Sequence, residues 1–167
     1  GAVEASLSIM VGGERALVDA LMPLLQCMGQ LIAYQGPAGA GQHTKMCNQI
    51  LIASTMIGVV ESLLYASRVG LDRARVIDIV GGGAAASWSW NNLGRRIVKG
   101  DDAPGFYIRH FVKDLGIALD EARRLNLTLP GLSMASDFYT QALAAGLGEC
   151  GTQALHHILT RLNANPR

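Results

Sequence analysis

Charge is scarce in this sequence, and neither sign dominates. Charged residues make up 16% of the 167 residues, below the roughly 25% that is usual for soluble domains. Lys and Arg total 14 against 13 Asp and Glu, and no run of like charges occurs. This balance argues against a nucleic-acid binder or a polybasic membrane patch. Because half of the residues are apolar, a sizeable core can be buried, and we expect a partner subunit or a further domain to cover part of the surface.

Cysteines and long apolar runs are also few. Cys27, Cys47 and Cys150 form an odd count without a CxxC pair, which favours a reducing, cytoplasmic location over a disulfide framework. The longest strongly apolar run without a charge, residues 50–60, is about half of the roughly 20 residues that a bilayer demands, so no membrane span is expected. The chain begins at Gly1 without Met or a signal-peptide pattern, as a fragment would.

The pattern of elements changes from mixed to helical near residue 39. A strand is expected over 6–11, a helix over 14–28 and a second strand over 30–34. Two strands bury too little to stand alone, so we interpret residues 1–38 as the trailing edge of a larger α/β domain. Residues 39–167 are expected to be all-helical. The expected helices cover 44–69, 72–80, 91–99, 110–125, 131–146 and 151–163.

Two motif-like strings lack residues that their chemistry needs. Gly39-Ala-Gly41 begins like a dinucleotide-binding turn, but the third glycine is absent. His43 and Cys47 share a helix face, yet two ligands do not make a metal site. His156 and His157 are adjacent and are expected on different helix faces. The sequence therefore predicts no metal site.

Lys45 is the only charged residue within residues 20–60, and the chain has three lysines against eleven arginines. An ammonium group in an apolar helical neighbourhood would be desolvated, which lowers its pKa and suits it to proton transfer near neutrality. The alternative is a snorkelling lysine whose head stays in water. Asn48 and Gln49 follow on the same helix face. Their amides would suit the oxygens of a small polar substrate, or would simply solvate the helix surface.

Lys113 and Asp114 form a second pair of interest. We expect Asp114 near the start of a helix, where a carboxylate interacts favourably with the helix dipole. This structural role would account for an aspartate at position 114 without a role in binding or catalysis.

Three segments together resemble one enzyme family. Gly39-x-Gly41-x-x-x-Lys45-x-x-Asn48-Gln49 resembles the catalytic signature of the β-hydroxyacid dehydrogenases, which include 3-hydroxyisobutyrate dehydrogenase and tartronate semialdehyde reductase. Residues 1–13 resemble the end of the family's substrate motif and the strand that follows it. Pro104-Gly-Phe106, followed by Lys113-Asp114-Leu115, resembles its cofactor-side segment.

The resemblance implies a role for each matching residue. Lys45 would be the general acid/base and Asn48 the substrate amide, while Gln49 stands where many members have a second Asn. Lys113 would reach the nicotinamide cofactor. The remaining implied positions, which line the active site, are Phe106 and Asp114. The implied reaction is hydride transfer between NAD or NADP and the carbonyl carbon of a small hydroxyacid's oxidised form, with Lys45 exchanging a proton with that oxygen.

The resemblance also implies an architecture. The chain would be mainly helical, with a β-α-β remnant of a Rossmann-like domain before an all-helical C-terminal domain of the 6-phosphogluconate dehydrogenase type, which would form a homodimer or higher oligomer. The cofactor would be bound mainly by a missing N-terminal domain, so this chain alone is expected to be inactive. Ile52 stands where the 6-phosphogluconate branch has a carboxylic acid, which argues against decarboxylation, and the retained Lys45 argues against an imine reductase. The alternatives are a non-catalytic dimerisation module and a ligand-binding module. Which hydroxyacid is used, and whether with NAD or NADP, stays open.

Overall fold

A computed structural model describes residues 1–164 of the chain. It divides into two compact units, residues 1–48 and a second unit that begins at Gln49. The division falls within the long helix α2 (Ala40–Arg68), beyond the change of pattern at residue 39. Helices dominate, as the sequence predicts.

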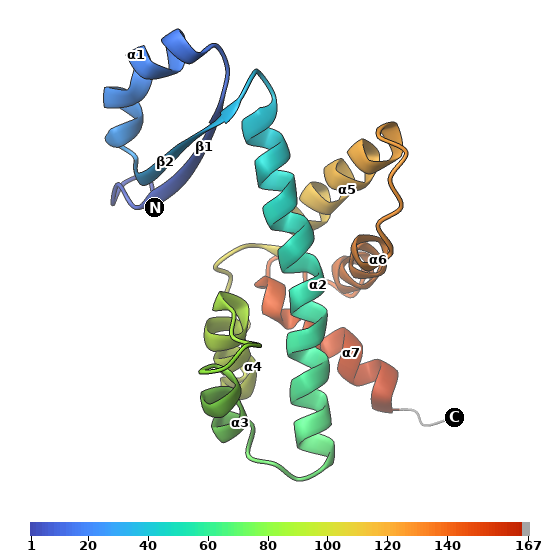
Figure 1. Cartoon of the computed structure of the whole chain (residues 1–167). Coiled ribbons are helices and arrows are strands. Elements are labelled where there is room, and N and C mark those ends of the chain that lie inside the picture. Colours follow the sequence, from blue (N-terminus) through green and yellow to red (C-terminus); the bar gives the residue numbers. More distant parts are fainter. Residues whose placement is uncertain (165–167) are drawn as a thin grey trace. The chain divides into compact units, whose positions relative to one another are not determined.

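The first unit contains a β-α-β arrangement (Figure 1). Strand β1 (Leu7–Gly12) leads into α1 (Arg15–Gln26), and β2 (Gly29–Gly36) returns parallel to β1, with Ile9 opposite Ile32. The predicted strands and helix are therefore confirmed to within a few residues. A helix between two parallel strands is the standard crossover connection.

Glycines let the end of β1 meet the start of α2. A Cβ atom on Gly41 would overlap the carbonyl oxygen of Met10, and one on Gly12 would lie 2.7 Å from the carbonyl oxygen of Pro37. Gly39 has a φ of +92°, which L side chains rarely adopt. At Gly41 the missing side chain thus makes room for protein backbone.

The second unit is helical after α2. Asp72 caps α3 by accepting hydrogen bonds from the amides of Ala74 and Arg75. A π-helical turn, η1, covers the first part of the helix expected over 91–99 and continues into α4. The elements are α3 (Arg73–Val80), η1 (Ser89–Gly94), α4 (Arg95–Lys99), α5 (Ile108–Arg124), α6 (Pro130–Ala144), η2 (Thr152–Ala154) and α7 (Leu155–Ala164).

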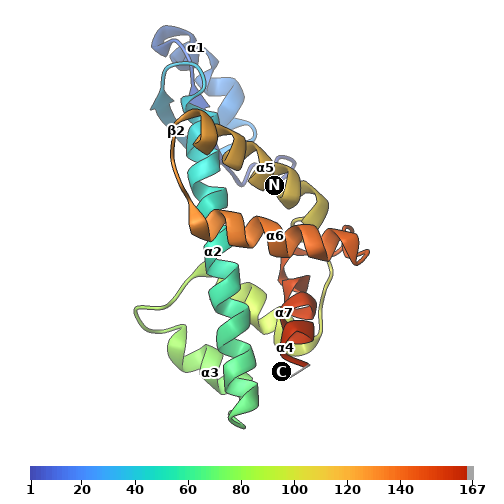
Figure 2. The same ribbon diagram turned by 90° about the vertical axis from the view of Figure 1, so that its right-hand side faces the viewer.

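The core of the second unit gathers around α5, α6 and α7. Helix α6 packs against both α5 and α7 (Figure 2). The rings of Phe111 and Tyr139 meet edge to face, with their centroids 4.8 Å apart. The Tyr139 hydroxyl donates a hydrogen bond to the carbonyl oxygen of Thr152 at 3.0 Å. Burial raises the pKa of Tyr139 far above its usual value, so this hydroxyl stays a donor.

Helix α2 is apolar over a longer stretch than the charge-free run of residues 50–60 indicates. It has 29 residues, and its most apolar stretch of 18 has a mean hydropathy of 1.7, enough by length and composition to cross a membrane. The prediction that no apolar segment is long enough to span a membrane was wrong. The few polar residues in α2 interrupt its apolar run without lowering its mean hydropathy below the level of a membrane span. Core helices of soluble proteins meet the same criterion. Within the second unit, α2 buries Met56, Val60 and Leu63 but leaves Leu51 exposed.

Candidate active site

Lys45 and Asn48 lie one turn apart on α2, in the first unit. The side chain of Lys45 is exposed and that of Asn48 is partly exposed. Of the two interpretations of Lys45, a desolvated ammonium and a snorkelling lysine whose head stays in water, this exposure favours the second, because a lack of nearby charges in the sequence does not bury a side chain. The role of Lys45 as an acid/base depends on its match to the dehydrogenase signature.

Gln49 and Asp114 form a buried hydrogen bond within the second unit. The amide nitrogen of Gln49 donates to Oδ2 of Asp114 at 2.7 Å. Gln49 is 1% exposed and Asp114 is 7% exposed. The amide nitrogen of Gln49, a predicted substrate contact, holds a carboxylate of the protein in this structure.

Asp114 lies inside α5, not at its start. The helix begins at Ile108, two residues before the expected position, so Asp114 belongs to its second turn. The explanation by the helix dipole was therefore wrong, since that effect fades within the first turn. A buried carboxylate needs partners, and Asp114 has Gln49 on one oxygen and the Lys113 ammonium on the other, 2.6 Å from Oδ1.

Lys113 extends from this buried carboxylate toward solvent, with 64% of its side chain exposed. The arrangement holds an ammonium at the surface by a charge-assisted contact to a carboxylate that cannot move freely. Such a fixed positive group suits the recognition of an anionic or strongly polar ligand.

Phe106 lies just before α5, in the same unit. Its ring meets Phe111 edge to face at 6.0 Å and lies 6.2 Å from the ring of His110. Its carbonyl oxygen accepts a hydrogen bond from the amide of Thr152 at 3.2 Å. The segment is thus anchored while the ring stays 37% exposed. Of the predicted site residues in the second unit, the structure joins Gln49, Lys113 and Asp114 through direct contacts.

A cluster that the sequence did not reveal joins the turn before α5 to α7. Nε2 of His157 lies 2.6 Å from Oδ2 of Asp102, and Nδ1 of His156 lies 3.8 Å from Oδ1 of the same carboxylate. Although the two histidines are expected on different helix faces, both approach this one carboxylate. Neighbours on a helix differ by about 100° in direction, and Asp102 lies where both rings reach it. Desolvation is the largest cause of the lowered pKa of His156.

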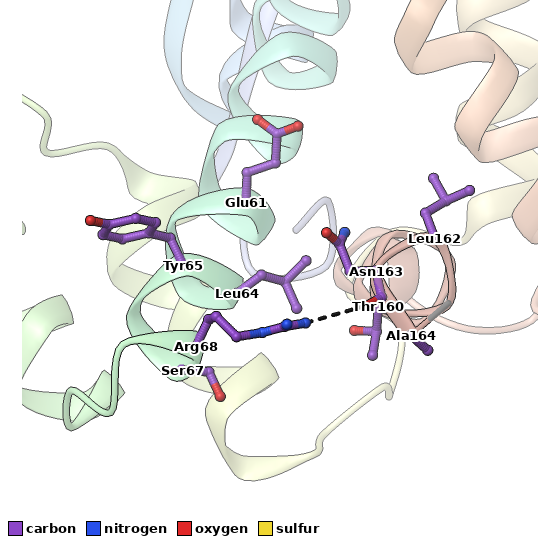
Figure 3. Close-up of a pocket in the computed structure, with 9 residues that line it drawn as sticks. All are labelled: Glu61, Leu64, Tyr65, Ser67, Arg68, Thr160, Leu162, Asn163 and Ala164. Atoms are coloured by element: carbon purple, nitrogen blue, oxygen red, sulfur yellow. Dashed lines mark hydrogen bonds between the residues drawn. The ribbon is translucent and has the colours of Figure 1, made fainter. Parts of the chain in front are cut away.

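An open groove of about 780 Å³ also lies in the second unit, between α2 and α7 (Figure 3). Arg68 crosses it and donates to the carbonyl oxygen of Asn163 at 3.2 Å. None of the predicted site residues lines it. The lining residues are Glu61, Leu64, Tyr65, Ser67, Arg68, Thr160, Leu162, Asn163 and Ala164.

Known proteins are similar to this chain in sequence. A family described as NAD-binding of NADP-dependent 3-hydroxyisobutyrate dehydrogenase matches residues 39–159. An uncharacterized oxidoreductase of Bacillus subtilis (strain 168), YkwC, is 49% identical over 95% of this chain and 55% of its own length. A probable 3-hydroxyisobutyrate dehydrogenase-like 1, mitochondrial, of Arabidopsis thaliana is 48% identical over 98% of this chain and 48% of its own length.

A solved structure has the same fold. The 3-hydroxyisobutyrate dehydrogenase of Mycobacterium tuberculosis, determined with L-serine, superposes with a TM-score of 0.88 at 30% identity, over 95% of this chain and 56% of that one. The chain thus spans about half the length of the relatives it matches. With the family match over residues 39–159, which includes Lys45 and Lys113, these likenesses show that the chain belongs to the 3-hydroxyisobutyrate dehydrogenase family.

Proposed function

We propose that the protein is an NAD(P)-dependent oxidoreductase that interconverts a small β-hydroxyacid and its oxo-acid or semialdehyde. Besides family membership, one observation carries the proposal: a buried carboxylate, Asp114, fixes the exposed ammonium of Lys113 within a family segment. That fixed charge fits the recognition of an anionic dinucleotide.

Lys45 is the proposed acid/base. Its exposed ammonium can donate a proton to the substrate oxygen as the carbonyl becomes an alcohol, and can take that proton back in the reverse direction. The same positive charge stabilises the developing alkoxide. Asn48, one turn further along α2, is proposed to bind a substrate oxygen through its amide.

NAD or NADP, when bound, supplies or accepts the hydride. On this chain, Lys113 is the proposed cofactor contact, held in place by Asp114, which in turn is held by Gln49. We therefore propose Gln49 and Asp114 as positioning residues, and Phe106, partly exposed before α5, as a wall of the substrate site. Because this sequence has no GxGxxG turn, we propose that residues outside it make most of the cofactor contacts.

We also propose a domain organisation and an oligomeric assembly. Residues 1–38 are assigned to the edge of the dinucleotide-binding domain, and residues 39–167 to a helical substrate and dimerisation domain of the 6-phosphogluconate dehydrogenase type. The assembly is proposed to be a cytoplasmic homodimer or higher oligomer. Exposed apolar side chains on the helical part, among them Ile79 at 78%, support an interface.

Turnover by the full-length protein tests this function. A panel of small β-hydroxyacids with NAD⁺ and NADP⁺ should give reduced cofactor with at least one pair, and the 167-residue chain alone should bind NAD(H) negligibly by calorimetry. Absence of turnover with every pair, in a folded and cofactor-binding protein, would contradict the dehydrogenase assignment. The same exposed apolar residues would then favour the second candidate, a non-catalytic dimerisation or ligand-binding module.

A further inference from the structure

Asp102, His156 and His157 are the one group of three possible metal ligands found within residues 1–164. Each offers one ligand atom, and these atoms all lie within 4.8 Å of one another. Zn²⁺ binds imidazole nitrogen and carboxylate oxygen at about 2.0–2.2 Å, so neighbouring ligand atoms in a tetrahedral site lie about 3.3 Å apart. Nε2 of His157 lies 2.6 Å from Oδ2 of Asp102, and Nδ1 of His156 lies 3.8 Å from Oδ1, the other oxygen of the same carboxylate; these distances fall on either side of that spacing. Small side-chain movements would therefore complete the geometry.

One oxygen of Asp102 has no hydrogen bond. Oδ1 is buried and lacks a hydrogen-bond partner, whereas Oδ2 meets His157. Buried polar atoms are nearly always satisfied, and an exception calls for an explanation such as an ion. The unsatisfied oxygen lies on the side of His156, 3.8 Å from its Nδ1, where a cation between the two would contact both.

The segment that precedes α7 holds the backbone around Asp102 in place through hydrogen bonds. Gln153, which is 1% exposed, donates its amide nitrogen to the carbonyl oxygens of Asp101 at 3.0 Å and Ala103 at 2.9 Å. The amide of Gly151 donates to the carbonyl oxygen of Asp102 at 2.9 Å. A Cβ on Gly151 would overlap the Gln153 amide, so only glycine leaves room for this clamp. The backbone that carries the Asp102 carboxylate is therefore held in place before any ion arrives, which favours a preformed site.

From this geometry we propose that Asp102, His156 and His157 bind a divalent transition-metal ion of the zinc class. Two imidazoles and one carboxylate suit Zn²⁺ or Co²⁺ better than Mg²⁺ or Ca²⁺, which require oxygen ligands. Three protein ligands leave a coordination position for water. Binding through Nδ1 of His156 replaces that atom's 3.2 Å contact with the carbonyl oxygen of Gln153. The ion would join the 101–103 turn to the first turn of α7, apart from the proposed contacts of Lys113 and Asp114.

Co²⁺ is the probe that tests this site, because its visible spectrum reports coordination geometry. Titration of the full 167-residue chain should give one tetrahedral Co²⁺ per chain without a thiolate charge-transfer band, and Zn²⁺ should displace it. The exposed Cys27 and Cys47 are changed to Ser in all samples, so that these two thiols do not contribute to binding, and the half-buried Cys150 would reveal itself by a thiolate charge-transfer band. An ion that binds only the folded chain should also raise its melting temperature.

Single variants locate the ion. His157→Gln and Asp102→Asn should each weaken binding by about tenfold or more, since each loses a ligand. His110→Gln, a change at an exposed histidine outside the cluster, should bind as the parent does. His156→Gln provides a further test if Asp102→Asn does not fold by circular dichroism. Absence of saturable binding by the parent, or equal binding by the folded parent and His157→Gln, would overturn the proposal and leave a structural Asp–His pair.

Discussion

The amide nitrogen of Gln49 lies 2.7 Å from Oδ2 of Asp114, although 65 positions separate the two residues. The other oxygen of Asp114 meets the ammonium of Lys113 at 2.6 Å. One buried carboxylate thus connects α2 to α5 and fixes a charged group at the surface. Its two partners are not equivalent, since Gln49 is buried with it and Lys113 extends into solvent.

Replacement of Gln49 should therefore cost stability. Gln49→Leu keeps much of the side-chain volume but leaves Oδ2 of Asp114 without this donor, and we expect a loss of roughly 1–3 kcal/mol in the free energy of unfolding. Urea denaturation measures it. Gln42→Leu, at an exposed position of the same helix, is the matched control and should stay within about 0.5 kcal/mol of the parent. Equal stability of the two variants would show that the buried hydrogen bond contributes little.

Two helical glycines should respond to alanine in opposite directions. A Cβ on Gly58 meets nothing within 4 Å, so Gly58→Ala should stabilise α2 by roughly 0.5–1 kcal/mol. A Cβ on Gly41 would overlap the Met10 carbonyl, so Gly41→Ala should destabilise the chain by roughly 1–3 kcal/mol. Thermal melts of both variants check the pair. A gain in stability for Gly41→Ala would contradict the close approach of β1 and α2.

The Tyr139 hydroxyl should contribute to the core through its hydrogen bond. Tyr139→Phe keeps the ring against Phe111 but removes the donor to the Thr152 carbonyl, at an expected cost of roughly 1–2 kcal/mol. Chemical denaturation compares it with Tyr65→Phe, a change at a tyrosine that is 71% exposed. If the two variants lose the same stability, the buried hydrogen bond has no measurable effect.

Self-association is expected because the chain exposes large apolar side chains. Leu51 and Ile79 are 69% and 78% exposed, and Trp88 is 70% exposed. Burial of such surface between subunits is favourable at about 25 cal/mol per Å². Sedimentation at micromolar concentration should therefore show dimers or larger species. A single species near the 17.7 kDa mass of one chain would contradict this prediction.

Local pattern was sufficient to predict most of the elements. Alternation and helical spacing placed β1, α1 and β2, and the absence of proline placed α2, although its start was expected at Thr44 instead of Ala40. The π-helical turn at Ser89 was not predicted, since it depends on packing that no short-range pattern records. Element type follows from neighbours along the chain, whereas exact ends depend on capping and contacts.

The site was harder to predict because burial is a tertiary property. Lys45 has no charged neighbours in the sequence and is nevertheless exposed, whereas Asp114 is flanked by a lysine and is buried. The contact between Asp102 and His157 spans 55 positions and belongs to no motif. Family resemblance could select residues, but only the fold shows which of them meet.

The role of Lys45 is the central claim, and a pair of variants of the full-length protein tests it most directly. Lys45→Ala should lower kcat by roughly 10²–10⁴ while NAD(P)H binding persists, because the proton donor is lost. Lys45→Arg keeps the charge but cannot release its proton, so it should also remain severely impaired. Lys99→Ala, at an exposed lysine that ends α4, should turn over as the parent does. Retention of most of the parent's kcat by Lys45→Ala would contradict the assignment.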